Sequence, residues 1–139
     1  MAITIKGALI GEYHPKVVSD LYMTDSEAAV VGQAYYLSSG RWTKSAATAA
    51  VEAVCLKAAT AGTDVTAIME LVKTGDILEA DYTGSPNAAF LPGLTVAVLD
   101  ANGANVASAT VSGGHLRILT KDTANTKVQM VANKNFTSI

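Results

Sequence analysis

Residues 30–44, VVGQAYYLSSGRWTK, decide the fold class that the sequence predicts. Two strand-forming segments, 34–37 and 41–44, flank the turn sequence Ser38-Ser-Gly40, so the stretch predicts a β-hairpin. Its aromatic residues could stack on a sugar or a base, but such a platform needs flanking polar groups and usually a basic groove. Cross-strand aromatic pairs stabilise small β domains, and we therefore expect Tyr35, Tyr36 and Trp42 to pack a core or an interface.

The next segment, residues 45–61, is rich in alanine and almost free of charge. Alanine favours a helix, whereas Val51, Val54 and Cys55 suit a buried strand. We expect a loop over 45–50 and a strand over 51–58, with Gly62 ending the segment.

Short strand patterns continue to the end of the chain. They cover residues 65–72, 77–82, 94–99, 105–111, 115–119 and 127–131, and Asn102-Gly103 is a strong turn signal between two of them. About eight to ten short strands with regular turns predict a mainly β domain, either a small barrel or a sandwich. Residues 2–14 suit a short strand or an extended arm, and residues 24–27 resemble either a helix cap or a turn. We therefore divide the chain into an N-terminal arm, 1–29, and a β-rich body, 30–139.

A faint internal repeat relates positions about 61 residues apart. Each copy would consist of a hairpin, a small-residue stretch, a strand, a turn and a strand. Because all strands share a period of two, chance alignment is a rival explanation. The paired positions are Gly32 with Gly93, Tyr35 with Val96, Leu37 with Val98, Ala46 with Ala107 and Cys55 with Leu116.

The composition limits the classes of function. The chain has 139 residues, of which 50% are apolar and 16% charged, with a net charge of −2. A typical globular chain has about 25% charged residues, so either the core is built of small residues or a partner covers part of the surface. Scattered charges argue against direct binding of nucleic acid. The absence of a long apolar window argues against a membrane span and a signal peptide. A single cysteine excludes an internal disulfide and fits synthesis in a reducing cytoplasm.

Few residues have the spacing of a reactive site. His14 and His115 do not lie at metal-ligand spacing from another histidine or cysteine. The sequence Ser112-Gly-Gly-His115 lacks the elbow and the orienting acid of a catalytic serine, and Cys55 lies between apolar neighbours. An acidic cluster, of which Glu79 and Asp81 share one strand face, could bind a cation, although a solvated face is the simpler interpretation; its members are Asp76, Glu79 and Asp81. We expect no enzyme activity, no cofactor and no metal.

The stretch VVGQAYYLSSGRWTKSAATAAVEAVCLKAATAGTDVTAIMELVKTGD resembles the capsid decoration, or cement, proteins of tailed bacteriophages. The resemblance extends over residues 30–132. It rests on a Val-Gly strand, a tight turn, a strand with a lysine, an alanine-rich connection and a strand of alternating valines. The matching positions are Val31-Gly32, Tyr36-Leu37, Gly40, Lys44, Ala46-Ala47, Val54, Leu56, Ala58-Ala59, Gly62 and Val65. The segments PGLTVAVLDANGANVASAT and HLRILTKDTANTKVQMVA resemble the continuation. Cys55 stands where such proteins more often have alanine or valine, and residues 1–29 do not match closely.

The resemblance implies a β-tulip-like structural protein of the virion. Such a protein would be made in the host cytoplasm, form homotrimers, bind the major capsid protein on the outside of the icosahedral head at threefold or pseudo-threefold positions, and stabilise the expanded shell. Alternatives are another virion module, such as a head fibre or tail tube, or a sugar-binding β module. Candidate capsid or trimer contacts lie in the arm, the hairpin and one loop: Ile3, Ile5, Leu9, Ile10, Tyr35, Tyr36, Trp42, Phe90, Leu91 and Pro92.

Overall fold

The computed structural model describes residues 3–9, 11–46, 49–93 and 96–132. In this part of the chain there are eleven strands and no helix, which confirms the prediction of a mainly β fold. The strands are β1 Thr4–Ala8, β2 Val17–Val18, β3 Ala34–Ser38, β4 Arg41–Lys44, β5 Ala53–Lys57, β6 Ile68–Leu71, β7 Asp76–Thr83, β8 Val96–Ala97, β9 Val106–Ala107, β10 Leu116–Asp122 and β11 Lys127–Ala132.

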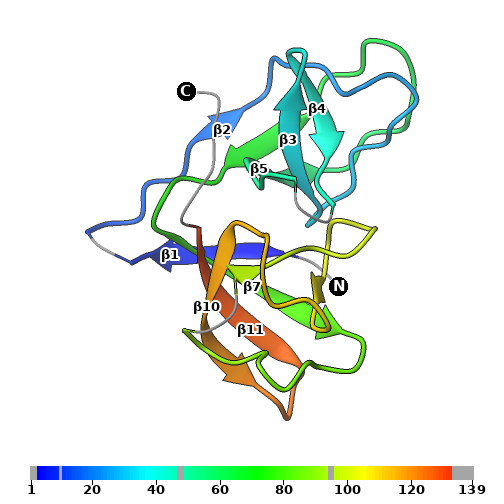
Figure 1. Cartoon of the computed structure of the whole chain (residues 1–139). Coiled ribbons are helices and arrows are strands. Elements are labelled where there is room, and N and C mark those ends of the chain that lie inside the picture. The colour runs from blue at the N-terminus through cyan, green and yellow to red at the C-terminus, as the bar shows by residue number, and fades with distance from the viewer. Residues whose placement is uncertain (1–2, 10, 47–48, 94–95, 133–139) are drawn as a thin grey trace.

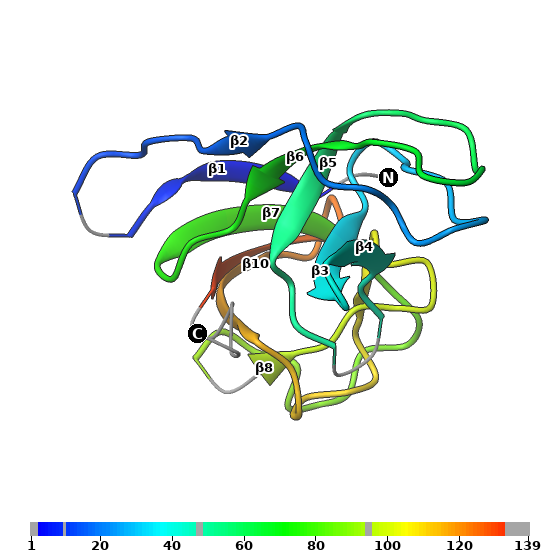
Figure 2. The same ribbon diagram turned by 90° about the horizontal axis from the view of Figure 1, so that it is seen from above.

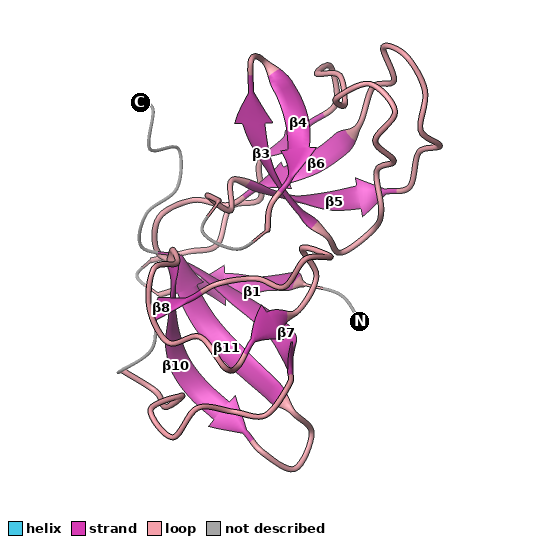
Figure 3. Cartoon of the chain, turned by 45° about the vertical axis from the view of Figure 1, so that its right-hand side comes forward, coloured by secondary structure: helices cyan, strands magenta, loops and turns pink. Residues whose placement is uncertain are grey.

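The strands form two sheets, which occupy the lower and upper halves of Figure 1 and are separated clearly in Figure 3. The first sheet has the antiparallel order β1-β7-β11-β10-β8, and β9 pairs in parallel with the end of β7. The second sheet has the antiparallel order β2-β6-β5-β3-β4. In each path the two outermost strands do not pair with each other. Neither sheet therefore closes into a barrel. Of the two architectures that the sequence suggested, a barrel or a sandwich, the closed barrel is not the one found.

The predicted hairpin forms as β3 and β4, with Leu37 opposite Trp42 and Ser38 opposite Arg41. Ser39 and Gly40 make the two-residue turn and both have positive φ, 51° and 77°, which matches the twist of the flanking strands. The alanine-rich segment also agrees with the prediction, because β5 occupies residues 53–57 and the described residues before 51 are irregular. Alanine does not make this segment helical, since Ala53, Val54 and Cys55 are buried alternately on the two faces of β5.

Two apolar clusters account for this double burial. The first core lies under the first sheet and reaches the inner face of the second sheet, where it includes Ala34 and Val54. The second core lies on the opposite face of the second sheet and includes Tyr35, Ala53 and Cys55, which alternate with the residues of the first core. A sheet buried on both faces uses small apolar residues and few charges, and this explains much of the composition.

The two halves of the chain repeat one topology. Strands β2 to β6 are ordered β2-β6-β5-β3, and strands β7 to β11 are ordered β7-β11-β10-β8 in the same sense. Gly32 and Gly93, paired by the sequence repeat, have φ of 80° and 77°, and their amides donate to Cys55 and Ile118 in equivalent strands. In each half the third strand makes a parallel contact with the start of the half: Trp42 of β4 pairs with Met23, which follows β2, and β9 pairs with β7. The predicted internal repeat is therefore present in the strand topology.

The two halves meet closely at the turn between β8 and β9. Gly103 has a φ of +67°, and a Cβ added to it would lie 2.4 Å from the carbonyl oxygen of Ser45. Its own carbonyl accepts a hydrogen bond of 2.8 Å from the Ala34 amide at the start of β3. The Asn-Gly pair thus forms a turn, as expected, and its glycine also joins the second half of the chain to the first.

The first 29 residues contribute a strand to each sheet. β1 pairs with β7, β2 pairs with β6, and Ile3 is buried in the first core. The division into an arm and a body stays a prediction, and the described part of the arm is integrated into the sheets.

Candidate binding surfaces

An apolar groove is lined by residues of β1, the edge strand of the first sheet, and by residues of the second sheet. Figures 1 and 2 show where β1 lies in the first sheet. The groove's volume of about 240 Å³ lies below the roughly 300–1,000 Å³ of typical small-molecule sites. The residues that line this groove come from β1, from the turn before β3, and from β5 and β6: Ile3, Thr4, Ile5, Val31, Gly32, Val54, Cys55, Leu56 and Glu70. Apolar side chains predominate among these residues.

Two local irregularities place apolar side chains at the mouth of the groove. The register of β5 against β6 shifts between Cys55 and Lys57, so Leu56 is the extra residue of a bulge and is 44% exposed. Val31 lies in the turn before Gly32 and is 52% exposed. The Gly32 amide donates to the Cys55 carbonyl and holds this turn against β5. Val31 and Leu56 thus form an exposed apolar mouth.

The groove exists because the first sheet does not cover the whole inner face of the second. Four residues lie in register across this face, from Val17 on β2 through Glu70 and Val54 to Ala34 on β3. Val17 is exposed, Glu70 is half-buried, and the other two are buried. Burial thus decreases steadily toward β2, and the space between the sheets is open at that side.

Glu70 is the charged residue of the groove lining. Its Oε2 atom is buried, and no described residue donates a hydrogen bond to it. Burial raises the pKa of this carboxyl group above its ordinary value of 4.5, and the charge of Lys73 only partly opposes the effect. The Lys73 ammonium group is bound elsewhere, because its Nζ lies 3.1 Å from Asp76 Oδ2. Glu70 therefore belongs to the groove lining and has one buried carboxylate oxygen without a hydrogen-bond donor among the described residues.

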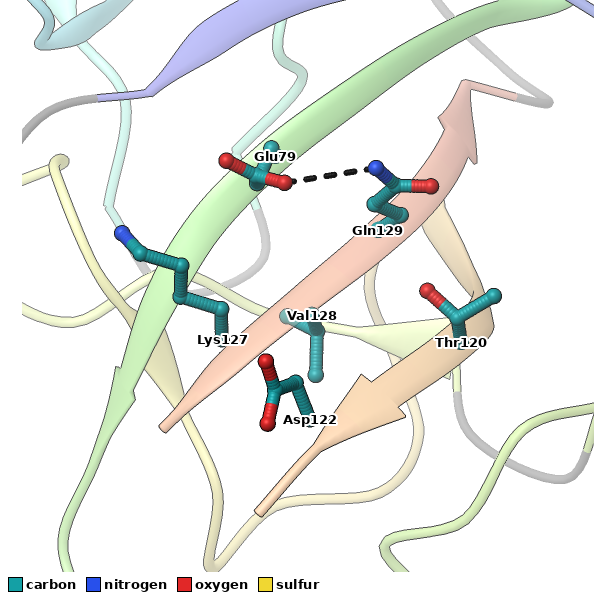
Figure 4. A pocket seen from close by; sticks show the side chains of 6 residues that line it. All are labelled: Glu79, Thr120, Asp122, Lys127, Val128 and Gln129. Carbon is teal, nitrogen blue, oxygen red and sulfur yellow. Dashed lines mark hydrogen bonds between the residues drawn. The ribbon is translucent and has the colours of Figure 1, made fainter. Parts of the chain in front are cut away.

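A second cavity lies on the outer face of the first sheet and is polar (Figure 4). Its charged groups already have partners, since Gln129 Nε2 donates to Glu79 Oε2 at 3.2 Å and Lys127 Nζ donates to Asp81 Oδ1 at 2.8 Å. Hydrogen bonds from Asn125 lower the pKa of Asp122. The six lining residues are Glu79, Thr120, Asp122, Lys127, Val128 and Gln129. The charged side chains of this cavity are therefore all paired with neighbouring side chains.

The acidic cluster from the sequence is divided between the two faces of β7. Glu79 and Asp81 lie on the outer face, as expected, whereas Asp76 points inward, is buried, and accepts hydrogen bonds from Lys73. Among the described residues, no three histidine, cysteine or acidic side chains lie close enough together to hold a metal ion.

The other residues with potential reactivity are not brought together. Burial raises the pKa of the Cys55 thiol, whose Sγ lies 3.1 Å from the Lys57 carbonyl oxygen. His14 is exposed and lies 3.5 Å from Glu12. His115 is half-buried and lies directly before β10.

The aromatic hairpin residues lie mostly inside the protein. Tyr35 and Trp42 are fully buried in the second core, at 0% exposure, and Tyr36 is half-buried. The Tyr35 hydroxyl accepts a hydrogen bond from the Val30 amide at 3.0 Å and donates to the Ala28 carbonyl at 3.1 Å. The aromatic platform required by the sugar-binding alternative is therefore not exposed.

The remaining contact candidates are divided between core and surface. Phe90 is buried beside Tyr82, with ring centroids 5.2 Å apart. Leu91 and Pro92, which follow it, are exposed. In the N-terminal segment Ile3 is buried, Ile5 packs against the first core, and Leu9 is exposed. Ile10 lies outside the described residues.

The sequence did not reveal the groove or the part that Glu70 plays in it. The groove depends on the packing of residues far apart in the chain, and its two exposed positions depend on a bulge and a turn. One local signal was present, because Glu70 is an acidic residue within the apolar strand pattern of residues 65–72. An acid on the face opposite Met69 and Leu71 indicated that this second face either meets water or requires a partner.

Comparison with known proteins gives no relative: no family model, no curated protein and no solved structure matches the chain. A search of the described residues finds no helix that is long and apolar enough to span a membrane.

Proposed function

We propose that the chain is a structural protein of a tailed-phage virion, a capsid decoration (cement) protein that binds the outside of the expanded head and stabilises it. The resemblance of residues 30–132 to that family supports this proposal. The single observation that carries it is the groove, an exposed apolar site that is too small for most ligands and suited to a protein segment.

The proposal includes the finer description of the fold, a β-tulip-like sandwich body. It also includes homotrimers, binding to the major capsid protein at threefold or pseudo-threefold positions, and synthesis in the host cytoplasm. Repetition of the contact over a shell would multiply a modest affinity per site. Among the residues expected to make contacts, the exposed Leu9, Leu91 and Pro92 remain candidates beside the groove, while Tyr35, Trp42 and Phe90 serve the core.

Co-sedimentation with expanded, empty heads tests the proposal. The heads are assembled from the major capsid protein encoded in the same genome, and light scattering gives the oligomeric state of the free protein. Leu56→Asp places a charge in the mouth of the groove and should abolish sedimentation with the heads. Thr120→Asp places the same charge on the outer face of the first sheet and should leave sedimentation unchanged. Equal sedimentation of both variants would exclude the groove as the contact.

A further inference from the structure

The groove contains a feature that a purely apolar docking site would not need. Glu70 Oε2 is buried without a hydrogen-bond donor among the described residues. Leaving a charged acceptor unsatisfied destabilises a protein, and such atoms are rare in native structures. The nearest cationic side chain along the chain, Lys73, is already paired with Asp76. The protein thus retains a destabilising carboxylate beside an apolar groove.

The edge of the groove also offers unpaired backbone. β1 is the outermost strand of the first sheet, and among the described strands it pairs with β7 alone. On the groove side, the Ile3 amide donates to Gly32 at the start of the strand, and no described strand pairs with this edge further along. A free strand edge can accept an extended segment of another protein through backbone hydrogen bonds.

We propose that the groove binds an extended segment of a partner protein that carries a lysine or arginine side chain. The aliphatic part of this side chain packs between Ile5 and Val54, and its cationic end donates to the carboxylate of Glu70, which has one oxygen without a donor. Lysine and arginine are suited to such a site, because they bury an apolar stem while the charge reaches a polar partner. A metal ion does not suit it, since the lining offers a single carboxylate and hard cations require six or more oxygen ligands.

The claim that the groove binds a lysine or arginine segment does not depend on which protein supplies the segment. That the segment belongs to a major capsid protein rests on the proposed function. The peptide experiment below tests the groove without a capsid, so a failure to bind peptide would leave the co-sedimentation result unaffected. In the same way, a failure to sediment with heads would leave the peptide result unaffected.

The test is a ¹H–¹⁵N NMR titration of the labelled full chain with synthetic peptides. The probe is the acetylated and amidated heptapeptide Thr-Val-Thr-Lys-Thr-Val-Thr, whose valines and lysine share one face when it is extended. We expect the amides of β1, of residues 54–56 and of Glu70 to shift. Replacing the lysine of the probe by glutamine should weaken binding at least fivefold. Replacing its third and fifth residues by proline, which removes backbone donors, should abolish binding.

Two protein variants test whether Glu70 is the residue that makes the protein prefer the lysine peptide. Glu70→Gln should bind the lysine and glutamine peptides equally. Glu79→Gln makes the same change on the outer face of the first sheet and should retain the fivefold preference. n-Butylammonium chloride serves as the probe for a site that recognises only a small amine.

Three results would overturn the proposal. The first is no shift around the groove, or shifts confined to another face. The second is equal affinity of the wild-type protein for the lysine and glutamine peptides. The third is binding of butylammonium as strong as that of the lysine peptide, which would make the groove a small-amine site.

Discussion

Replacing Gly103 by alanine tests how the two halves of the chain are joined. Gly103 has a φ of +67°, and its Cβ would lie 2.4 Å from the Ser45 carbonyl oxygen. Gly40 is a matched control, because it has a φ of +77° in a turn and its Cβ would meet nothing within 4 Å. The two substitutions therefore share the backbone strain and differ in the contact between the halves.

The magnitudes separate the two variants clearly. A left-handed backbone with a Cβ costs about 1–2 kcal/mol, and this is the whole expected effect of Gly40→Ala. Gly103→Ala adds about 1–3 kcal/mol for the displaced backbone and about 1 kcal/mol for the weakened hydrogen bond from the Ala34 amide. We therefore expect Gly103→Ala to destabilise the protein by about 2–4 kcal/mol more than Gly40→Ala.

Urea unfolding followed by the fluorescence of the single tryptophan, Trp42, measures both effects. A thermal scan should show a further decrease of roughly 5–15 °C in the Tm of Gly103→Ala. If the two variants unfold at the same urea concentration, the turn does not hold the halves together as described.

Three further predictions concern buried polar groups. Tyr35→Phe should lower stability by about 1–3 kcal/mol, because it leaves the Val30 amide without its acceptor. In the wild type, burial raises the pKa of Tyr35 to about 12, so absorbance at alkaline pH should show one tyrosine ionising after the others. The stability of the folded protein should fall as the pH rises from 10 toward 12. The late ionisation should be missing in Tyr35→Phe, which checks the assignment. Glu70→Gln should be more stable than the wild type at pH 7, because burial disfavours the ionised carboxylate of Glu70 in the folded protein. The raised pKa of Glu70 stabilises the wild type below pH 4.5, and this contribution is lost as the pH rises. The advantage of the variant should therefore shrink on acidification, and a constant difference in stability would contradict this. Trp42→Phe should lower the free energy of unfolding by less than about 2 kcal/mol, against about 3–5 kcal/mol for Trp42→Ala. The smaller effect is expected because the indole Nε1 has no hydrogen-bond partner to lose among the described residues. An equal decrease in both variants would show that the indole group makes a specific contact.

The hairpin and β5 could be predicted because their signals are local. A turn between two aromatic segments requires only neighbouring residues, and the period of two is visible in any strand. The boundary of the N-terminal segment was harder to assign. The sequence pattern shows that residues 2–14 can extend, but their pairing with β7 depends on a strand more than sixty residues away.

The groove could not be predicted for a related reason. Its lining combines β1, a turn before β3, and strands β5 and β6, and each segment alone reads as an ordinary strand or turn. The exposure of Leu56 depends on a shift in register that the sequence does not mark. The burial of Tyr35 and Trp42 depends on the second core, which the loops on the outer face of the second sheet complete. Burial on both faces also explains the low charge without requiring a partner over the whole surface.

Saturation binding to expanded heads tests the central claim most directly. Increasing amounts of wild-type protein and of Leu56→Asp are mixed with empty expanded heads, and the pelleted protein is measured. The account predicts that the wild type saturates at a fixed number of copies per head, set by its threefold or pseudo-threefold positions, and that Leu56→Asp remains in the supernatant. Wild-type protein that stays in the supernatant at every concentration would contradict it.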